Sequence, residues 1–336
     1  MPKENRNSNK QHIYPKSLII RFLKDDKVHF RSKQNSKFHE GKNTSRFYAH
    51  KKLWDERSEK GWMKEIEDSL SNLCRKIDDN KPLRDEDHKL ITEFYLLWYC
   101  RSYSDKYPKD KNRMIHKSEH LEEFRQGRLN TSLLLAAYQS SIETIPLETI
   151  PNGFDYEKGH ICEIRYLLRK KLSGNQFLNS SRVLMSPPNS SEHAASLESN
   201  IPWSSTNPNI SSVENINNRE GVHYFDEQGY MPSQIANGLW IQKSHDMLRR
   251  RFHNLKWGIL IADCGEFVVP TGINSAWLVP ISPTIALIAN IVGTHDITCG
   301  DIKNLNNNLI QHSELWMSQT PENTMLNNEN CPNFSK

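Results

Sequence analysis

The chain has 336 residues, enough for one large domain or two of ordinary size with a true core. Hydrophobic residues make up 36% of it and its mean hydropathy is −0.74, on the polar side of globular proteins. The formal net charge of +4 excludes a protein that is strongly basic over its whole surface.

Charge is not evenly spread along the chain. The first sixty residues contain sixteen Lys and Arg against seven Asp and Glu. Such a basic surface attracts phosphates or anionic lipid, while the plainer alternative is a solvated arm that binds nothing. Residues 1–10 are polar, and we expect them to form a disordered arm.

The cysteines lie far apart and contain no C-x-x-C pair. This spacing is typical of reduced, buried thiols in a cytosolic protein rather than of a disulfide framework. The stretch SLIIRFL is too short for the core of a secretory signal, and charge follows it at once. The longest apolar run carries Pro280 and Pro283, which indicate strands and turns. We therefore predict a cytoplasmic protein without a membrane partner. The six cysteines are Cys74, Cys100, Cys162, Cys264, Cys299 and Cys331.

The first predicted element is a β-hairpin over residues 17–31, with Asp25 and Asp26 at its turn. His12 and Pro15 precede it, where the chain enters the fold. A histidine at this place can serve as an acid, a base or a ligand. The alternative is a histidine whose ring makes structural contacts, and the residues alone leave both readings open.

Two amphipathic helices follow. Apolar residues spaced by three and four predict one buried stripe on each helix. The first stripe is Trp62, Ile66, Leu70, Leu73 and Ile77, and the second is Leu90, Phe94 and Leu97. Continued by four residues, the second stripe reaches Arg101. We therefore expect a guanidinium at the end of a buried face.

A buried Arg101 needs a carboxylate or a carbonyl as its partner. One interpretation is a structural ion pair with Glu65 or Glu67 of the preceding helix, or a side chain that extends from the helix end to water. The functional interpretation is an arginine that binds an anion.

The middle of the chain is predicted to be mostly helical. Helices are expected over residues 113–126 and 131–143 and within YEKGHICEIRYLLRKKL. Residues 173–232 are dense in Ser, Asn and Pro, which predicts a long loop or insert. Composition does not separate a plain loop from a lid.

The C-terminal part begins with a helix over residues 233–253. In KWGILIADCGEFVVPTG, two strands around a Cys-Gly turn predict a hairpin, and SAWLVPISPTIALIANIV adds one or two strands. A closing helix is expected to bury one face, formed by Ile302, Leu305, Leu309 and Ser313.

These elements define an α+β fold. We expect the N-terminal and C-terminal hairpins to form one antiparallel sheet, with the mostly helical middle packed on it. The predicted organisation is an arm, an N-terminal hairpin with the helical region, an insert, the rest of the same domain and a disordered tail. The corresponding ranges are 1–10, 11–172, 173–232, 233–319 and 320–336.

Three further groups are weaker candidates. His160, Cys162 and Glu163 lie within four residues, but a helix would point them to different faces, so we predict no metal site. Arg113 and His120 have a spacing that helical ribonucleases use and that chance often produces. The basic stretch LRRRFHNLKW either binds phosphate or caps a helix end.

The opening QHIYPKSLIIRF resembles the H-x-x-P-x-x-x-L-x-x-F start of a bacterial family known as domain of unknown function 4238. Later stretches resemble further blocks of this family, in order. These are an F-Y pair before a glutamate-bearing helix (SRFYAHKKLWDERSEKGWMKEIED), an apolar helix ending in Arg101 (YLLWYCRSYS), a hairpin (KWGILIADCGEFVVPTG), a P-L-S-P strand (LVPISPTIALI) and a closing L-N helix (LNNNLIQHS). The likeness spans residues 12 to about 318.

One departure from the family pattern concerns the end of the hairpin. The family usually has a Phe followed by T-S-D-x-P, whereas this chain reads VVPTGIN, with Thr271 near the place of the aspartate. If that aspartate is catalytic, this chain lacks the activity or uses Glu266 or Asp263 instead. If it is a turn residue, Thr271 is a mild replacement.

Members of the family occur among anti-phage defence genes, so the resemblance implies antiviral defence by abortive infection without naming a chemistry. The leading interpretation is a toxic effector that acts as a nuclease. His12 would then be the general acid or base, Arg101 would stabilise phosphate charge beside Glu67, and Arg21 and Arg46 would bind the substrate.

Two alternatives stay open. The first is a non-enzymatic sensor that recognises a phage component, and the second is a structural α+β protein. The partner would be nucleic acid or a phage protein. Whether the chain is an enzyme, which cofactor it takes and its oligomeric state are unknown from the sequence.

Overall fold

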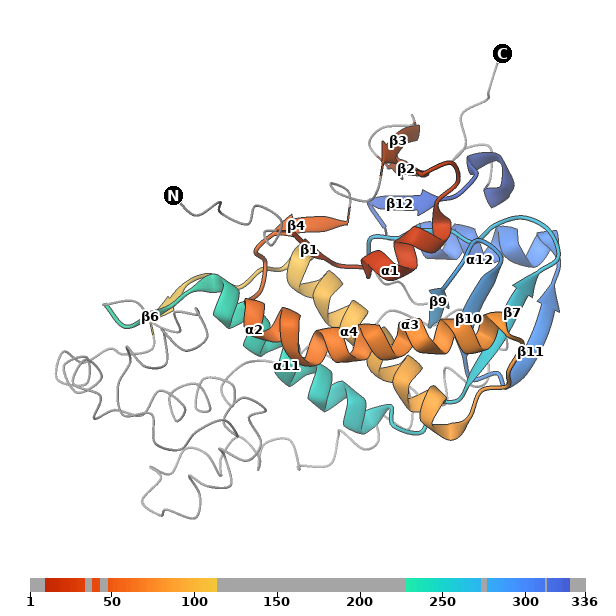
Figure 1. Cartoon of the computed structure of the whole chain (residues 1–336). Helices are drawn as coiled ribbons and strands as arrows, with labels where there is room; N and C mark the ends of the chain where they lie inside the picture. Colours follow the sequence, from red (N-terminus) through yellow and green to blue (C-terminus); the bar gives the residue numbers. More distant parts are fainter. Residues whose placement is uncertain are drawn as a thin grey trace, which may run out of the picture.

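The computed structural model describes residues 10–33, 38–42, 48–113, 228–272, 277–311 and 313–326 (Figure 1). The predicted helices over 113–126 and 131–143, and the predicted insert over 173–232, lie almost wholly outside these residues. The described part is α+β, as predicted.

The first helix of the fold corrects the predicted N-terminal hairpin. SLIIRF is helical, forming α1 (Lys16–Ile19) and the 3-10 turn η1 (Ile20–Phe22) directly after Pro15. Leu18, Ile19 and Phe22 are buried, a helical spacing that a strand could not present to one core. The N-terminal hairpin is instead β2 (Lys27–Ser32) with β3 (Phe38–Lys42).

The turn before β2 was predicted correctly. Asp25 and Asp26 both have positive φ, at 51° and 59°, which aspartate tolerates better than most residues. Upstream of α1, the short strand β1 (Lys10–His12) pairs antiparallel with β4 (Ala49–Lys51).

A layer of helices forms the middle of the molecule (Figure 1). Both predicted amphipathic helices are confirmed, and their apolar stripes are buried apart from the half-buried Trp62 and Leu90. The α4 helix is buried almost all round because it packs against both α3 and α11. The elements of the layer are α2 (Glu56–Ser58), the π-helical turn η2 (Glu59–Met63), α3 (Lys64–Asp78), α4 (Asp85–Lys106) and α11 (Ser233–Arg251).

The first of two four-stranded sheets joins the two ends of the described chain. Its strand order is β3-β2-β12-β8, and every pairing is antiparallel. β12 (Leu315–Ser318) lies between β2 and β8 (Val269–Pro270), with Met317 opposite both Phe30 and Val269. N-terminal and C-terminal strands therefore share an antiparallel sheet, but the expected single sheet of two hairpins is wrong, because the strands of the described chain form more than one sheet.

The second sheet was not predicted as a separate unit. Its order is β11-β7-β10-β9, with β10 antiparallel to both neighbours and β11 parallel to β7. The hairpin expected in KWGILIADCGEFVVPTG is wrong, because β7 and β8 belong to different sheets. The C-terminal hairpin is β9 with β10. The four strands are β7 (Trp257–Ala262), β9 (Leu278–Pro280), β10 (Ile285–Ala289) and β11 (Gly293–Ile297).

This second sheet is covered on both faces. Trp257 and Ile259 of β7 join the core of the helical layer, while Leu260 and Ala262 join a second core under α12 (Cys299–Gln311). Alternate residues of one strand thus enter opposite cores, which explains why β7 is apolar without a break.

The C-terminal segment is ordered further than predicted. Ile302, Leu305, Leu309 and Ser313 are all buried, as expected, although Ser313 lies after the end of α12. The 3-10 turn η5 (Pro321–Thr324) follows β12, and both Pro321 and Thr324 are buried. A disordered tail beginning at residue 320 is therefore wrong for residues 320–326. No helix among the described residues combines the length and apolar character needed to cross a membrane.

Candidate functional site

The candidate site is built around the guanidinium of Arg101, near the end of α4. Its side chain is 1% exposed, although arginine is among the residues least often buried. It occupies this place because the apolar stripe of α4 continues through it. Burial of a permanent cation is tolerated only where anionic and carbonyl partners surround it.

Three groups supply these partners. Arg101 Nη1 donates to the Glu67 carboxylate on α3 and to the main-chain oxygen of His12, at 3.3 Å. Arg101 Nη2 lies 3.5 Å from Glu59 Oε2 on η2. Of the two glutamates predicted on the preceding helix, Glu67 forms the pair, and Glu65 is exposed.

An aromatic ring closes the cluster. The guanidinium carbon of Arg101 lies 5.0 Å from the ring centroid of Trp54, a favourable cation–π distance. Trp54 Nε1 donates to Glu59, so the ring also holds the second carboxylate. Gln11 of β1 fixes Trp54 by accepting from its main-chain N–H at 2.9 Å and donating to its carbonyl at 2.7 Å.

The cluster holds two carboxylates against one cation. Burial raises the pKa of Glu67, Arg101 lowers it, and the nearby Glu59 raises it. The pKa of Glu67 is therefore raised above that of an ordinary glutamate. Glu67 therefore keeps its proton to a higher pH than an ordinary glutamate does. A carboxyl of this kind can act as an acid, although buried ion-pair networks show the same shift.

The structure brings together three predicted residues, His12, Glu67 and Arg101. The atom through which His12 reaches Arg101 is its main-chain oxygen, and its side chain is half buried. At 1% exposure, Arg101 directs its guanidinium at groups of its own chain and does not present it to solvent.

The predicted binding residue Arg21 lies elsewhere. Its guanidinium forms two hydrogen bonds to the Asp78 carboxylate at the end of α3, at 2.6 and 2.8 Å. Its Nε donates to the Ile281 carbonyl at 2.7 Å, between β9 and β10. Arg21 therefore ties η1 to α3 and to the second sheet. Arg46 lies outside the described residues.

Thr271 serves the structure as a strand-end residue. Its main-chain N–H donates to the Leu315 carbonyl at 2.8 Å and its hydroxyl donates to the same oxygen at 2.9 Å. Its hydroxyl also lies 3.2 Å from that of Ser313. These contacts fit the reading in which Thr271 replaces a turn residue.

The two acids considered as substitutes for the missing aspartate differ. Glu266 is buried, and its carboxylate accepts from Thr320 N at 2.7 Å and from Asn323 Nδ2 at 2.9 Å, so it anchors η5. Asp263 is exposed at the end of β7. Neither belongs to the Arg101 cluster.

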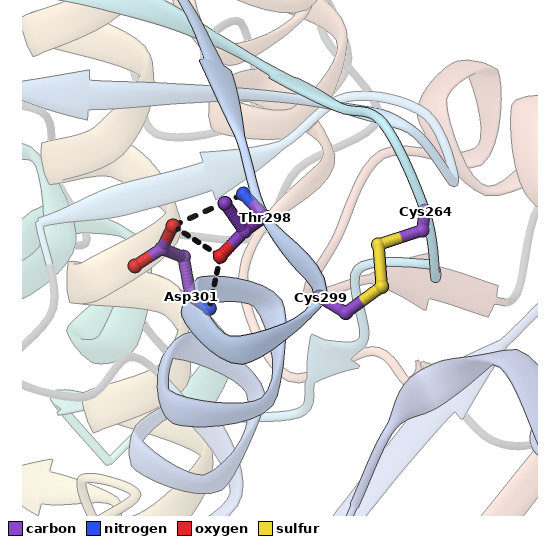
Figure 2. Close-up of a disulfide and its surroundings, with 4 residues drawn as sticks. All are labelled: Cys264, Thr298, Cys299 and Asp301. Atoms are coloured by element: carbon purple, nitrogen blue, oxygen red, sulfur yellow. Dashed lines mark hydrogen bonds between the residues drawn. A yellow bond between two sulfur atoms is a disulfide. The ribbon is translucent and has the colours of Figure 1, made fainter.

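A disulfide joins Cys264, after β7, to Cys299, the first residue of α12 (Figure 2). The expectation of reduced thiols throughout is therefore wrong for this pair, while Cys74 and Cys100 are free and buried. Thr298 and Asp301 cap the helix beside it: Thr298 N and Oγ1 donate to Asp301 Oδ2, at 3.0 and 2.8 Å. This exchange satisfies donors at the helix start.

Sequence reasoning missed a buried histidine. His245 of α11 is buried, and its Nε2 lies 2.9 Å from the Glu93 carbonyl of α4. Because a carbonyl can only accept, Nε2 carries the proton of a neutral ring. Burial holds the pKa of His245 down, to about 4. No local pattern marks such a residue, since its partner lies 152 residues away.

The metal-ligand group and the ribonuclease-like spacing stay predictions. His160, Cys162, Glu163 and His120 lie outside the described residues, and within the described ranges no three His, Cys, Asp or Glu side chains gather as metal ligands.

Two residues of the basic stretch at the end of α11 form ion pairs with α4. Arg249 Nη1 lies 3.3 Å from Glu93 Oε1, and Lys256 Nζ lies 2.5 Å from Asp85 Oδ1.

Comparison of the chain with models of protein families, with curated proteins and with solved structures found no match in any of the three. The family resemblance therefore stays a prediction.

Proposed function

We propose that this chain is a bacterial anti-phage defence protein that works by binding a phage component. The observation that carries the binding role is the burial of Arg101, at 1% exposure, with Glu67, Glu59 and the His12 carbonyl around it. A cation used in this way holds helices together and has no free face for a scissile phosphate.

The defence role rests on the family resemblance. The stretches that carry it contact one another: the Tyr14 hydroxyl donates to the Pro280 carbonyl, and Asn306 Oδ1 accepts from Val268 N at 3.0 Å. These contacts support the view that the resembling blocks encode a shared scaffold. The phage component would then be recognised on the surface of that scaffold.

A nuclease effector is the second candidate, and one observation favours it. Glu67 has a raised pKa beside Arg101 and His12, the combination expected of an acid next to a cation in a catalytic cluster. Catalysis would require the cluster to open, because its guanidinium is covered.

A plaque assay separates the two candidates. Wild type, His12→Ala and the double variant Arg101→Met/Glu67→Gln are expressed at equal soluble levels and challenged with a panel of phages. The double variant removes the Arg101–Glu67 charge pair, and the other carboxylate of the cluster, Glu59, is part-exposed and keeps the Trp54 Nε1 donor. We expect all three to protect, with RNA and DNA intact in infected cells.

Loss of protection in both folded variants, with cleaved nucleic acid in cells expressing wild type, would overturn the binding role in favour of the nuclease. No protection by wild type against any phage of the panel would overturn the defence role itself.

A cytoplasmic location belongs to the proposal because phage components are made there. Fractionation of expressing cells tests it, and the Cys264–Cys299 disulfide, unusual in a reducing compartment, makes the test informative.

A further inference from the structure

The two bonded cysteines lie next to each other at the ends of two parallel strands. In the register of β7 with β11, Ala262 lies opposite Ile297, and two further residues along each strand bring Cys264 opposite Cys299 (Figure 2). The Cα atoms of the two cysteines are 5.4 Å apart, within the roughly 4.4–6.8 Å that a disulfide requires. The pairing of the strands therefore brings the two residues to bonding distance.

Hydrogen bonds that do not involve sulfur hold the chain on both sides of the pair. Directly before Cys264, Asp263 N donates to the Ile297 carbonyl at 3.2 Å. Directly before the other cysteine, the main-chain N–H and the hydroxyl of Thr298 both donate to Asp301, so the start of α12 has its own cap (Figure 2). None of these contacts needs the disulfide.

A buried asparagine ties the body of α12 to the chain that follows Cys264. Asn306 is fully buried, and its Nδ2 donates to the carbonyls of Glu266 and Thr324, both at 2.7 Å. Its Oδ1 accepts from Val268 N at 3.0 Å. One side chain thus satisfies three buried main-chain groups. We therefore expect α12 to stay in place when the disulfide is reduced.

The cysteines of the described residues differ in access to solvent. Cys299 is exposed and Cys264 is half-buried. The free Cys74 and Cys100 are buried, and desolvation raises the pKa of both thiols, that of Cys74 to about 11. Because the thiolate is the reactive form, a buried thiol with a raised pKa reacts slowly at neutral pH. Reagents in solution can therefore reach the bonded pair more readily than the two free thiols.

We infer that Cys264 and Cys299 form a thiol–disulfide exchange site, which a small-molecule thiol reduces and the corresponding small-molecule disulfide re-forms while the chain stays folded. The accessible Cys299 carries the mixed disulfide, and Cys264 is the resolving residue. The site lies outside the Arg101 cluster, and its chemistry does not depend on the binding role proposed above.

Reduction proceeds in two exchanges. The thiolate of the small molecule attacks Cys299 Sγ, the bond between the two cysteines breaks, and its electron pair leaves on Cys264 Sγ, which takes a proton from water. A second thiolate attacks the small-molecule sulfur of the mixed disulfide and releases Cys299 as a thiolate. Two small thiols are thereby oxidised to one disulfide, and the protein disulfide is reduced to two thiols. Oxidation is the reverse sequence.

The test holds the purified full chain in anaerobic buffers with set proportions of reduced and oxidised glutathione. Acid stops the exchange, alkylation marks the free thiols, and peptide mapping follows each of the six cysteines separately. Circular dichroism of the same samples reports whether the chain is folded. The buried Cys74 and Cys100 are internal controls and should stay free of glutathione.

We expect the bonded fraction of the pair to rise from about one tenth to about nine tenths as the ratio of oxidised glutathione to the square of reduced glutathione rises about 80-fold. This dependence is that of a two-electron exchange in which one disulfide replaces two thiols. The circular dichroism spectrum should be the same at both ends of the titration.

Single variants assign the two roles. Cys264→Ser leaves Cys299 without its resolving partner, so oxidised glutathione should leave a stable mixed disulfide on Cys299. In Cys299→Ser, the half-buried Cys264 should form its adduct about tenfold more slowly. An adduct that forms at Cys264 as fast as at Cys299, or faster, would overturn this assignment. The titration of wild type needs neither variant.

Three results would overturn the exchange site itself. One is a bond that persists in the folded chain under excess dithiothreitol and opens only in urea, as a purely structural disulfide would. Another is loss of the folded spectrum as soon as the pair is reduced. The third is a reduced, folded chain in which oxidised glutathione does not close the pair.

Discussion

Arg101 of α4 and Glu67 of α3 form an ion pair in which the arginine is 1% exposed and the glutamate 22% exposed. The guanidinium is also held by Glu59 and by the main chain of His12, so it joins α4 to α3, η2 and β1. This pair connects four elements at one point.

Arg101→Ala should therefore destabilise the fold strongly. The change leaves two carboxylates without their cation, and breaking a buried pair in this way typically costs about 3–5 kcal/mol. Arg101→Met/Glu67→Gln should cost less, since only Glu59 then loses the cation, and Glu59 is part-exposed and keeps its Trp54 donor. Urea unfolding followed by circular dichroism measures both. A single variant within about 1 kcal/mol of wild type would show that the pair contributes little.

Acid should weaken the protein through His245. Its pKa is about 4 in the folded protein, mainly because the ring is buried, and near 6.5 in an unfolded chain. The unfolded chain thus takes up the proton first, and stability present above about pH 6.5 is lost as pH falls toward 4. The contribution is on the order of 3 kcal/mol.

The groups near His245 include the cations Arg249 and Arg101, which lower its pKa further, and the ring of Trp62, 5.1 Å away. His245→Gln keeps a donor for the Glu93 carbonyl but does not titrate. As the pH is lowered from 7 to 4, the unfolding free energy of wild type should fall more than that of this variant. A difference that does not change with pH would contradict the neutral, buried histidine.

Gly238→Ala should be destabilising although it lies inside α11. Alanine in a helix interior is ordinarily favoured over glycine by about 1 kcal/mol. Here the added methyl group would clash with the Asp55 carboxylate, which caps α2 by accepting from Ser58 N at 3.0 Å. Overpacking and disturbance of the cap should together outweigh the helical preference, giving a net loss of about 2 kcal/mol.

The control for this change is Gly272→Ala, where an added methyl group meets no atom within 4 Å. It should leave the unfolding free energy within about 0.5 kcal/mol of wild type. A rise in melting temperature for Gly238→Ala would show that Asp55 moves aside without cost.

Loss of the Cys264–Cys299 disulfide should lower stability by about 4 kcal/mol, the value that the chain-entropy model assigns to a loop of this length. The two cysteines are 35 residues apart in the sequence. Urea unfolding of wild type with and without reductant, beside Cys264→Ser/Cys299→Ser, measures the change. Reductant should shift the wild type and not the double variant. Non-reducing peptide mapping that finds both thiols free would refute the bond.

The sequence predicted the helical layer and the centre of the candidate site well. The spacing of apolar residues in α3 and α4 repeats over several turns, which identifies a helix and its buried face. Burial of Arg101 followed from the same spacing, and the need for an anionic partner pointed to Glu65 or Glu67, of which Glu67 forms the pair.

The strands were harder to predict. SLIIRF is too short for the spacing of its apolar residues to distinguish a helix from a strand, and the structure shows that it is helical. The separation of β7 and β8 into different sheets depends on partners far along the chain, which no local pattern reveals. The disulfide could not be predicted for the same reason, since only the fold brings Cys264 near Cys299.

The pairing of β2 with β12 cannot form until most of the chain has been synthesised. His29 of β2 contacts the carbonyl of Gln319, 290 residues later, and β12 is the strand that completes the middle of the first sheet. At roughly 5–20 residues per second, a ribosome needs about 15–60 s to supply the missing strand. During that time one edge of the β2–β3 hairpin lacks its partner strand, and such an unpaired edge can pair with the strands of other chains.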